Sequence, residues 1–145
     1  MMRIVLDTGI LVSALWKKEG KPAFLVRKVL ENVYTPCYDH RIMDEYLEVL
    51  YRPRFAFKPF LVQDLLSGIE SNGLSVIVPK VDMPFKDEDD RMFYEVAKFC
   101  NATLITGNIQ HFPNSPDIMT VSRFLQQHDT ETYDYFETKY IEKDY

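Results

Sequence analysis

The sequence predicts an α/β domain in which a parallel sheet of four to five strands lies between two layers of helices, as a three-layer α/β/α sandwich. Short apolar, β-branched runs alternate along the chain with longer segments whose apolar residues recur at helical spacing. Such alternation is typical of parallel sheets, because the chain needs a crossover to return to the start of the next strand. The length of 145 residues suits one domain.

Five short runs are predicted as strands. They are rich in β-branched, aromatic and other apolar residues, and turn signals or polar residues bound them. These runs span residues 3–6, 33–37, 74–78, 102–106 and 118–121.

Helices are predicted in the segments between these strands. Apolar side chains three and four residues apart mark residues 10–16, 22–30, 42–50, 61–69, 87–100 and 122–127. Pro22 suits the first turn of a helix, whereas Pro53 should end the helix before it because proline cannot donate the helical hydrogen bond. We therefore expect residues 52–55 to form a basic loop and residues 107–116 a polar one.

The chain divides by composition into a domain at residues 1–128 and an acidic, tyrosine-rich tail at residues 129–145. The net charge is −5, of which the tail contributes −4 through six acidic residues and two lysines, so the rest carries −1. A nearly neutral domain argues against nucleic-acid binding through a uniformly basic surface. The tail has little periodicity and is predicted as a final helix, a partner-binding arm or a partly disordered segment.

Composition, the length of the apolar runs and the placement of the cysteines exclude other broad classes of protein. Hydrophobic residues make up 46% of the chain and charged residues 27%, as in ordinary globular proteins. No apolar run approaches the roughly 20 residues of a membrane span, so we expect a soluble, cytoplasmic protein. Cys37 and Cys100 stand alone in apolar segments and are predicted to be buried free thiols.

Acidic and hydroxyl-bearing residues recur where predicted strands end and helices begin. Open parallel sheets bind ligands outside the carboxyl ends of their strands. Carboxylates gathered there without His or Cys suit Mg²⁺ or Mn²⁺ rather than zinc or copper. The residues at these positions are Asp7, Glu45, Asp87, Asp89, Asp90 and the turn Thr106-Gly107-Asn108.

Each of these acids also has a purely structural interpretation. Asp7 could cap the helix that follows it, and the aspartates at 87, 89 and 90 could cap and complement the dipole of theirs. Glu45 alone could lie on a solvated helix face. His111, three residues beyond Asn108, could contact a phosphate or leaving group, although a single histidine in a loop is more often incidental.

Four ordered blocks of sequence resemble PIN-domain ribonucleases, particularly the VapC-like toxins of bacteria and archaea. The blocks are IVLDTGILVSAL at 4–15, DEYLEVLYRPRF at 44–55, DEDDRMF at 87–93 and ATLITGNIQHF at 102–112. The resemblance covers about residues 3 to 125, and its specificity comes from the order of the blocks.

Carried over residue by residue, this resemblance implies that Asp7, Glu45 and Asp90 are catalytic and bind the metal. The fourth position departs from the pattern, because Asn108 stands where many relatives have Asp; it is taken as a metal ligand that brings no charge. Accessory roles beside the metal are implied for Thr8, Asp87, Asp89 and Thr106. Candidate contacts to RNA phosphates are Lys17, Lys18, Arg52, Arg54 and Lys58.

The expected function is a Mg²⁺- or Mn²⁺-dependent endoribonuclease, with one or two ions that activate water and stabilise the leaving oxygen. The resemblance further implies the toxin of a toxin–antitoxin pair, with a small antitoxin protein as partner. The aromatic content of 14% makes a homodimer a further expectation. The alternatives are a catalytically weakened PIN-like module that binds RNA or protein, and a small phosphatase, against which Gly9 counts.

Overall fold

A computed structural model describes residues 1–80 and 82–143 and contains a five-stranded parallel sheet. The sheet order is β3-β2-β1-β4-β5, and every neighbouring pair is parallel. The predicted α/β class and parallel sheet are confirmed. The strands are β1 (Arg3–Leu6), β2 (Thr35–Tyr38), β3 (Leu74–Ser75), β4 (Thr103–Ile105) and β5 (Ile118–Met119).

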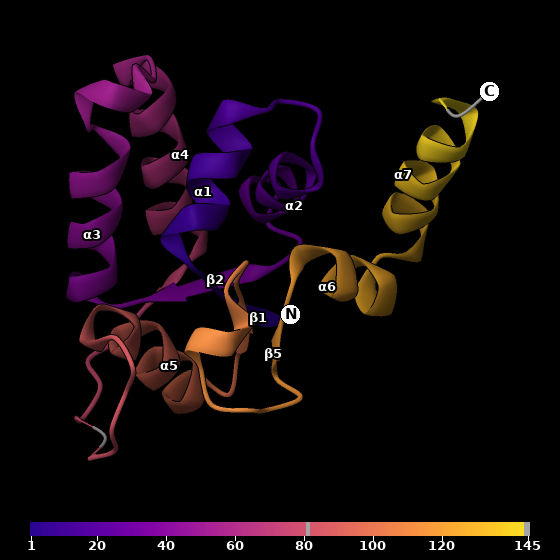
Figure 1. Cartoon of the computed structure of the whole chain (residues 1–145). Coiled ribbons are helices and arrows are strands. Elements are labelled where there is room, and N and C mark those ends of the chain that lie inside the picture. Colours follow the sequence, from indigo (N-terminus) through magenta and orange to yellow (C-terminus); the bar gives the residue numbers. More distant parts are fainter. Residues whose placement is uncertain (81, 144–145) are drawn as a thin grey trace.

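Helices cover both faces of the sheet (Figure 1). α1 and α2 lie on one side, with the α3–α4 pair projecting beside them, and α5 lies on the other side against β1, β2 and β4. The α-helices in the described residues are α1 (Thr8–Trp16), α2 (Lys21–Leu30), α3 (His40–Leu50), α4 (Pro59–Asn72), α5 (Glu88–Cys100), α6 (Val121–His128) and α7 (Thr130–Lys143). Two 3₁₀ turns, η1 (Pro53–Phe55) and η2 (Ile109–His111), lie where the basic loop and the polar loop were predicted.

The central strands carry the core. Every residue of β4 and residues 4–6 of β1 are buried, which explains why these runs are continuously apolar rather than alternating. Phe93 and Phe124 are fully buried large side chains from α5 and α6. A sheet covered on both faces holds the strand ends rigidly, and so fixes the residues that follow each strand.

Four of the five strands differ from their predicted bounds. β4 is one residue shorter at each end, β5 ends at Met119 because Val121 begins α6, and β2 and β3 differ for the following reasons. Residue 33 belongs to the end of α2, because its amide donates to the Lys28 carbonyl while Asn32 adopts a left-handed φ of 65°. β3 stops at Ser75 instead of residue 78, with a last bond from the Val76 amide to Tyr38. Ile77 is 92% exposed, whereas Val76 and Val78 pack partly against the core. The strand ends because β2 ends at Tyr38 and leaves these residues no neighbouring strand to pair with.

The strand order reverses between β1 and β4. The chain builds outward from β1 through β2 to β3, and then returns to place β4 and β5 on the other side of β1. Crevices at such a reversal are where open α/β sheets bind ligands. The residues that leave β1 and β4 therefore face the expected position of a site.

The described part of the tail is helical. α7 follows α6 and anchors on α2 through Phe136, whose ring meets Phe24 edge-on at 5.0 Å between centroids. Of the three forms predicted for the tail, the final helix is confirmed for residues 130–143. Both cysteines are buried and free, as predicted. In residues 1–80 and 82–143 no helix is long and apolar enough to cross a bilayer.

Candidate active site

Asp7 leaves β1 at the point of strand reversal. Its amide donates to the Ile105 carbonyl at 3.0 Å, which continues the pairing of β1 with β4. Although Asp7 occupies the N-cap position of α1, its side chain makes no capping hydrogen bond. Its Oδ2 atom instead accepts a hydrogen bond from the Thr106 hydroxyl at 2.7 Å. The carboxylate is thus held across the two strand ends rather than used to start the helix.

Glu45 reaches the same place from α3. The Thr8 hydroxyl, buried at the start of α1, donates a hydrogen bond to Glu45 Oε2. The neighbouring Tyr46 is fully buried and donates from its hydroxyl to the Leu6 carbonyl at 2.6 Å. Tyr46 therefore fixes α3 against the end of β1, and this contact sets Glu45 beside Asp7.

The three aspartates at the start of α5 have different environments. Asp87 caps the helix, since its Oδ1 atom accepts from the Asp89 amide at 3.0 Å. Asp89 is exposed. The Asp90 side chain is only 18% exposed, and its Oδ2 atom lies 3.3 Å from His111 Nδ1 of η2. Asp90 is thus the aspartate of this group that enters the site.

The site concentrates negative charge around Glu45. Burial is the main cause that raises the pKa of Glu45, and the hydrogen bond from Thr8 opposes this rise. Three neighbouring carboxylates raise the pKa of Glu45 further, those of Asp7, Asp89 and Asp90. The ionised form of Glu45 is therefore disfavoured in the metal-free protein.

Asp90 responds to the same field. Burial raises the pKa of Asp90, and the charges of Asp7 and Asp87 add to that rise, whereas the nearby His111 lowers it. Glu45 and Asp90 thus both interact with Asp7, although they come from different helices. Asp7 after β1, Glu45 on α3 and Asp90 on α5 are therefore close enough for the charge of Asp7 to act on both other carboxylates, and we refer to these three as the acidic cluster.

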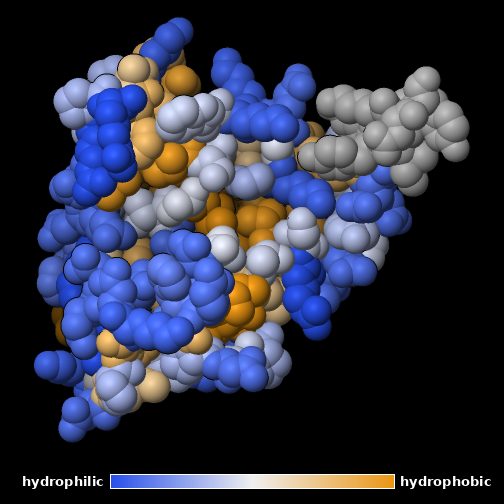
Figure 2. Space-filling view, viewed as in Figure 1, coloured by the Kyte–Doolittle hydropathy of each residue, from blue (hydrophilic) through white to orange (hydrophobic). Residues whose placement is uncertain are grey.

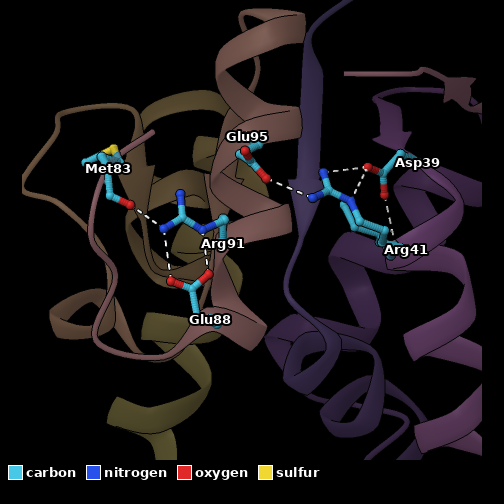
Figure 3. A network of polar contacts seen from close by, with 7 residues as sticks. Asp39, Arg41, Met83, Glu88, Arg91 and Glu95 are labelled. Atoms are coloured by element: carbon cyan, nitrogen blue, oxygen red, sulfur yellow. Dashed lines mark hydrogen bonds and ion pairs between the residues drawn. The ribbon is translucent and has the colours of Figure 1, made fainter. Parts of the chain in front are cut away.

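An ionic contact ties the two helices that supply Glu45 and Asp90. Figure 3 shows Arg41 of α3 between Asp39 and Glu95, with Arg41 Nη1 at 2.8 Å from Glu95 Oε1 and Nε at 2.8 Å from Asp39 Oδ2. Glu95 lies on α5 and is 1% exposed. Within α5, Arg91 Nε donates to Glu88 Oε2 at 2.6 Å. The contact between Arg41 and Glu95 joins α3 to α5, and it resists the separation of these helices that repulsion between Glu45 and Asp90 favours.

The fourth predicted ligand lies in the turn after β4. Thr106 is fully buried, and its Oγ1 atom accepts a hydrogen bond from the Asn108 amide at 3.0 Å while it donates to Asp7. The Asn108 residue itself is exposed. Thr106 therefore couples the turn to Asp7, while the neutral Asn108 side chain adds no charge to the cluster.

The donor chemistry fits a hard divalent cation. The Asp90 Oδ2 atom is buried, and among the described residues its close basic neighbour is His111, with Nδ1 at 3.3 Å. A buried carboxylate oxygen with so little hydrogen bonding is costly, and a cation would satisfy it. Within the same residues, no three His, Cys, Asp or Glu side chains converge as a preformed metal cluster. Hydroxyl groups hold two of the carboxylates, Thr106 that of Asp7 and Thr8 that of Glu45.

The predicted basic residues lie on the surface around the end of α1 and η1. Lys17, Lys18, Arg54 and Lys58 are exposed. Arg52 forms a bidentate contact with Glu48, with Nη2 at 2.7 Å from Oε2. These side chains form no part of the acidic cluster itself.

Sequence reasoning missed three residues that shape the site. Tyr46 and Arg41 were not singled out, and His111 was considered only as a contact to a phosphate or leaving group, not as a neighbour of Asp90. Their contacts join segments far apart in the chain, as between His111 and Asp90. The one available signal was position: His111 follows β4 by six residues, in the loop that leaves the strand reversal.

A comparison with protein families gives one match: a model described as PIN domain matches residues 3–110. The match includes the acidic residues of the site and the Thr106 turn, and it ends within η2. No curated protein and no solved structure matches the chain significantly.

Proposed function

The chain belongs to the PIN domain family, whose members are generally nucleases, and on that premise we propose that it is a Mg²⁺- or Mn²⁺-dependent endoribonuclease. The observation that carries the proposal is the Asp7 carboxylate, held by Thr106 across the strand reversal and close to Glu45 and Asp90. Residues 1–128 would carry this activity, with the remainder as an appendage.

The roles of the side chains follow from their contacts. Asp7, Glu45 and Asp90 would hold the cation, and the side-chain carbonyl oxygen of Asn108 would be a neutral fourth ligand. A cation bound there supplies activation of the attacking water and neutralises charge, which lets a phosphodiester approach an acidic site. Thr106 and Thr8 orient Asp7 and Glu45 through their hydroxyls, and Asp87 holds the start of α5. His111 steadies Asp90 from η2.

The exposed basic residues near the end of α1 and η1 would contact RNA phosphates. They offer positive charge in a chain whose net charge is −5, so substrate binding would be local rather than spread over the surface. This set is Lys17, Lys18, Arg52, Arg54 and Lys58.

We propose further that the protein is the toxin of a toxin–antitoxin pair. The support is the resemblance of the four sequence blocks to toxin-type PIN ribonucleases, together with an acidic cluster that a basic side chain would neutralise. An antitoxin that inserts an Arg or Lys toward Asp7 and Asp90 would form charge-assisted hydrogen bonds there and displace the cation. Co-expression of the protein with a candidate antitoxin, followed by purification of a stable complex of the two, tests this proposal.

A catalytically weakened PIN-like module is the second candidate. One observation favours it: the fourth position carries the neutral, exposed Asn108 rather than an acid. Such a module would bind RNA or protein with little response to Mg²⁺ or Mn²⁺.

Cleavage of a mixed RNA pool distinguishes the two candidates. Purified protein is assayed with EDTA, Mg²⁺ or Mn²⁺ beside Asp7→Asn and Asp90→Asn, with Asp64→Asn on α4 as the matched control. We expect metal-dependent cleavage that is lost in the first two variants and kept in the control, because Asp64 is exposed on another helix and takes no part in the acidic cluster. Equal inactivity of all four proteins with every metal, without a bound inhibitor, would instead support the binding module.

A further inference from the structure

A cluster of three aromatic side chains lies at the end of α1 that is remote from Asp7. Trp16, the last residue of α1, meets Phe55 edge-on at 5.8 Å and Phe57 edge-on at 6.2 Å between ring centroids. Phe55 and Phe57 stack on each other at 5.3 Å with their planes 8° apart. The cluster joins two segments about forty residues apart and has a defined geometry.

This cluster is open to solvent. Trp16 is 67% exposed, and Phe55 and Phe57 are partly exposed. Figure 2 shows apolar side chains reaching the surface at the upper left, where the ends of α1, α3 and α4 come together in Figure 1. Burial of such an indole would contribute about 2–3 kcal/mol, so its exposure leaves a favourable contact unused.

The charge around the cluster is opposite to that of the whole chain. Residues 16–20 and 48–58 contain five basic residues and two acidic ones, a net charge of +3 in a chain of −5. One of the two acids, Glu48, is paired with Arg52. The Arg54 guanidinium lies over the Phe55 ring at 4.8 Å, so a cation is already held against an aromatic face.

We propose that the exposed indole of Trp16, supported by the stacked rings of Phe55 and Phe57, is a stacking platform for unpaired bases of single-stranded RNA, with the surrounding Lys and Arg residues binding the backbone. Exposed aromatic rings among basic side chains bind single-stranded nucleic acid, because every base offers a flat face and every linkage a negative charge. An apolar partner helix would bury the rings but would not neutralise the net charge of +3 around them. A duplex would match the charge but keep its bases stacked away from the rings.

This inference rests on the proposed ribonuclease function and makes it more specific. A strand that stacks on Trp16 runs along α1 toward Thr8 and Asp7 at the other end of that helix. The platform would thus hold the substrate strand one helix length away from the acidic cluster.

The chain offers a direct probe, because Trp16 is its only tryptophan. The full-length protein in EDTA is titrated with a 12-nucleotide oligoadenylate, a 12-base-pair RNA duplex and inorganic polyphosphate, while tryptophan emission is followed. The RNA is checked afterwards for integrity. We expect the oligoadenylate to quench the emission, and the duplex and polyphosphate to leave it nearly unchanged.

Aromatic variants test whether the Trp16 ring itself contributes to RNA binding. Trp16→Ala should weaken oligoadenylate binding, measured by anisotropy of labelled RNA, by about 5- to 100-fold, and Trp16→Phe should keep most of the affinity. Phe99→Ala, at an exposed aromatic residue of α5, is the matched control and should bind normally. The variants should melt within a few degrees of the wild type, since Trp16 is exposed.

Three results would overturn the proposal: unchanged affinity of Trp16→Ala, equal quenching by duplex and single strand, or emission that changes with protein concentration alone. The last result would assign the cluster to contact between two copies of the chain. Because binding is measured without metal, failure of RNA cleavage would refute the nuclease proposal but leave the stacking result interpretable.

Discussion

Glu45→Gln should make the metal-free protein more stable and the metal-loaded protein less stable. Glu45 is half-buried among carboxylates, and burial with the charges of Asp7, Asp89 and Asp90 raises its pKa. A carboxyl whose folded pKa exceeds the value of about 4.3 in the unfolded chain destabilises the fold as the pH rises through that folded pKa. Glutamine removes the charge and still accepts the hydrogen bond from Thr8.

The expected magnitude follows from this environment. Relief of one such repulsive site is typically worth about 0.5–2 kcal/mol, or about 2–6 °C in Tm for a domain of this size. Mn²⁺ at about 100 times its Kd should stabilise the wild type by about 2.7 kcal/mol, or about 5–10 °C, and should do little for Glu45→Gln. The order of the two melting temperatures therefore reverses when metal is added.

Thermal melts in EDTA and in Mn²⁺ measure both effects. In EDTA the gap between variant and wild type should grow as the pH rises above the unfolded-state pKa of about 4.3, because the raised pKa of Glu45 makes its ionisation cost stability in the folded protein. Glu48→Gln, an exposed position on the same helix, is the control and should change little under either condition. The reasoning is refuted if Glu45→Gln melts below the wild type in EDTA, or if Mn²⁺ raises both proteins equally.

Three further predictions concern other residues of the chain. Asn108→Asp should lower the metal-free Tm by about 2–4 °C by adding a charge beside the cluster, and should tighten Mn²⁺ binding about 3- to 10-fold by calorimetry; unchanged binding would exclude position 108 as a ligand. Asp87→Ala should cost about 1 kcal/mol of unfolding free energy, because the α5 cap is lost, while the Tm increase on adding Mn²⁺ persists. Burial, with Cys100 close by, raises the pKa of Cys37 to about 12, so neither buried thiol should react with a disulfide reagent at pH 8 until guanidinium unfolds the chain; rapid reaction of the native protein would contradict the packing.

The layout of the fold was predictable because local patterns determine it. The apolar run of β1 and the helical spacing of α3 and α5 carry their structure in their own residues. The predicted strand bounds are wrong where contacts with other elements determine the structure. Residue 33 has the composition of a strand but closes α2. Residues 76–78 alternate as a strand does, but β2 ends at Tyr38, so beyond the bond from the Val76 amide they have no strand to pair with.

The candidate site divides in the same way. Asp7 could be singled out because it follows a strand, whereas position alone left Asp90 together with Asp87 and Asp89, and the resemblance to PIN-domain ribonucleases chose among them. Thr8 and Thr106 were expected beside the acids, but the partner of each could not be predicted, since Thr106 meets Asp7 across 99 residues; nor could the contact of Tyr46 with Leu6 across 40. Such pairs arise from sheet order and helix packing, which periodicity does not encode. The aromatic cluster was missed because Trp16 and Phe55 each look like a single surface residue.

The pairing of β1 with β4 has a consequence for how the protein is made. Asp7 is synthesised early, but β4 and the Thr106 that follows it leave the ribosome about a hundred residues later. Until β4 inserts beside β1, the nascent chain has no partner for Asp7 and no strand reversal. A chain stalled before that point would carry most of the acids of the site without their arrangement, so a nuclease of this design would stay harmless during its own translation.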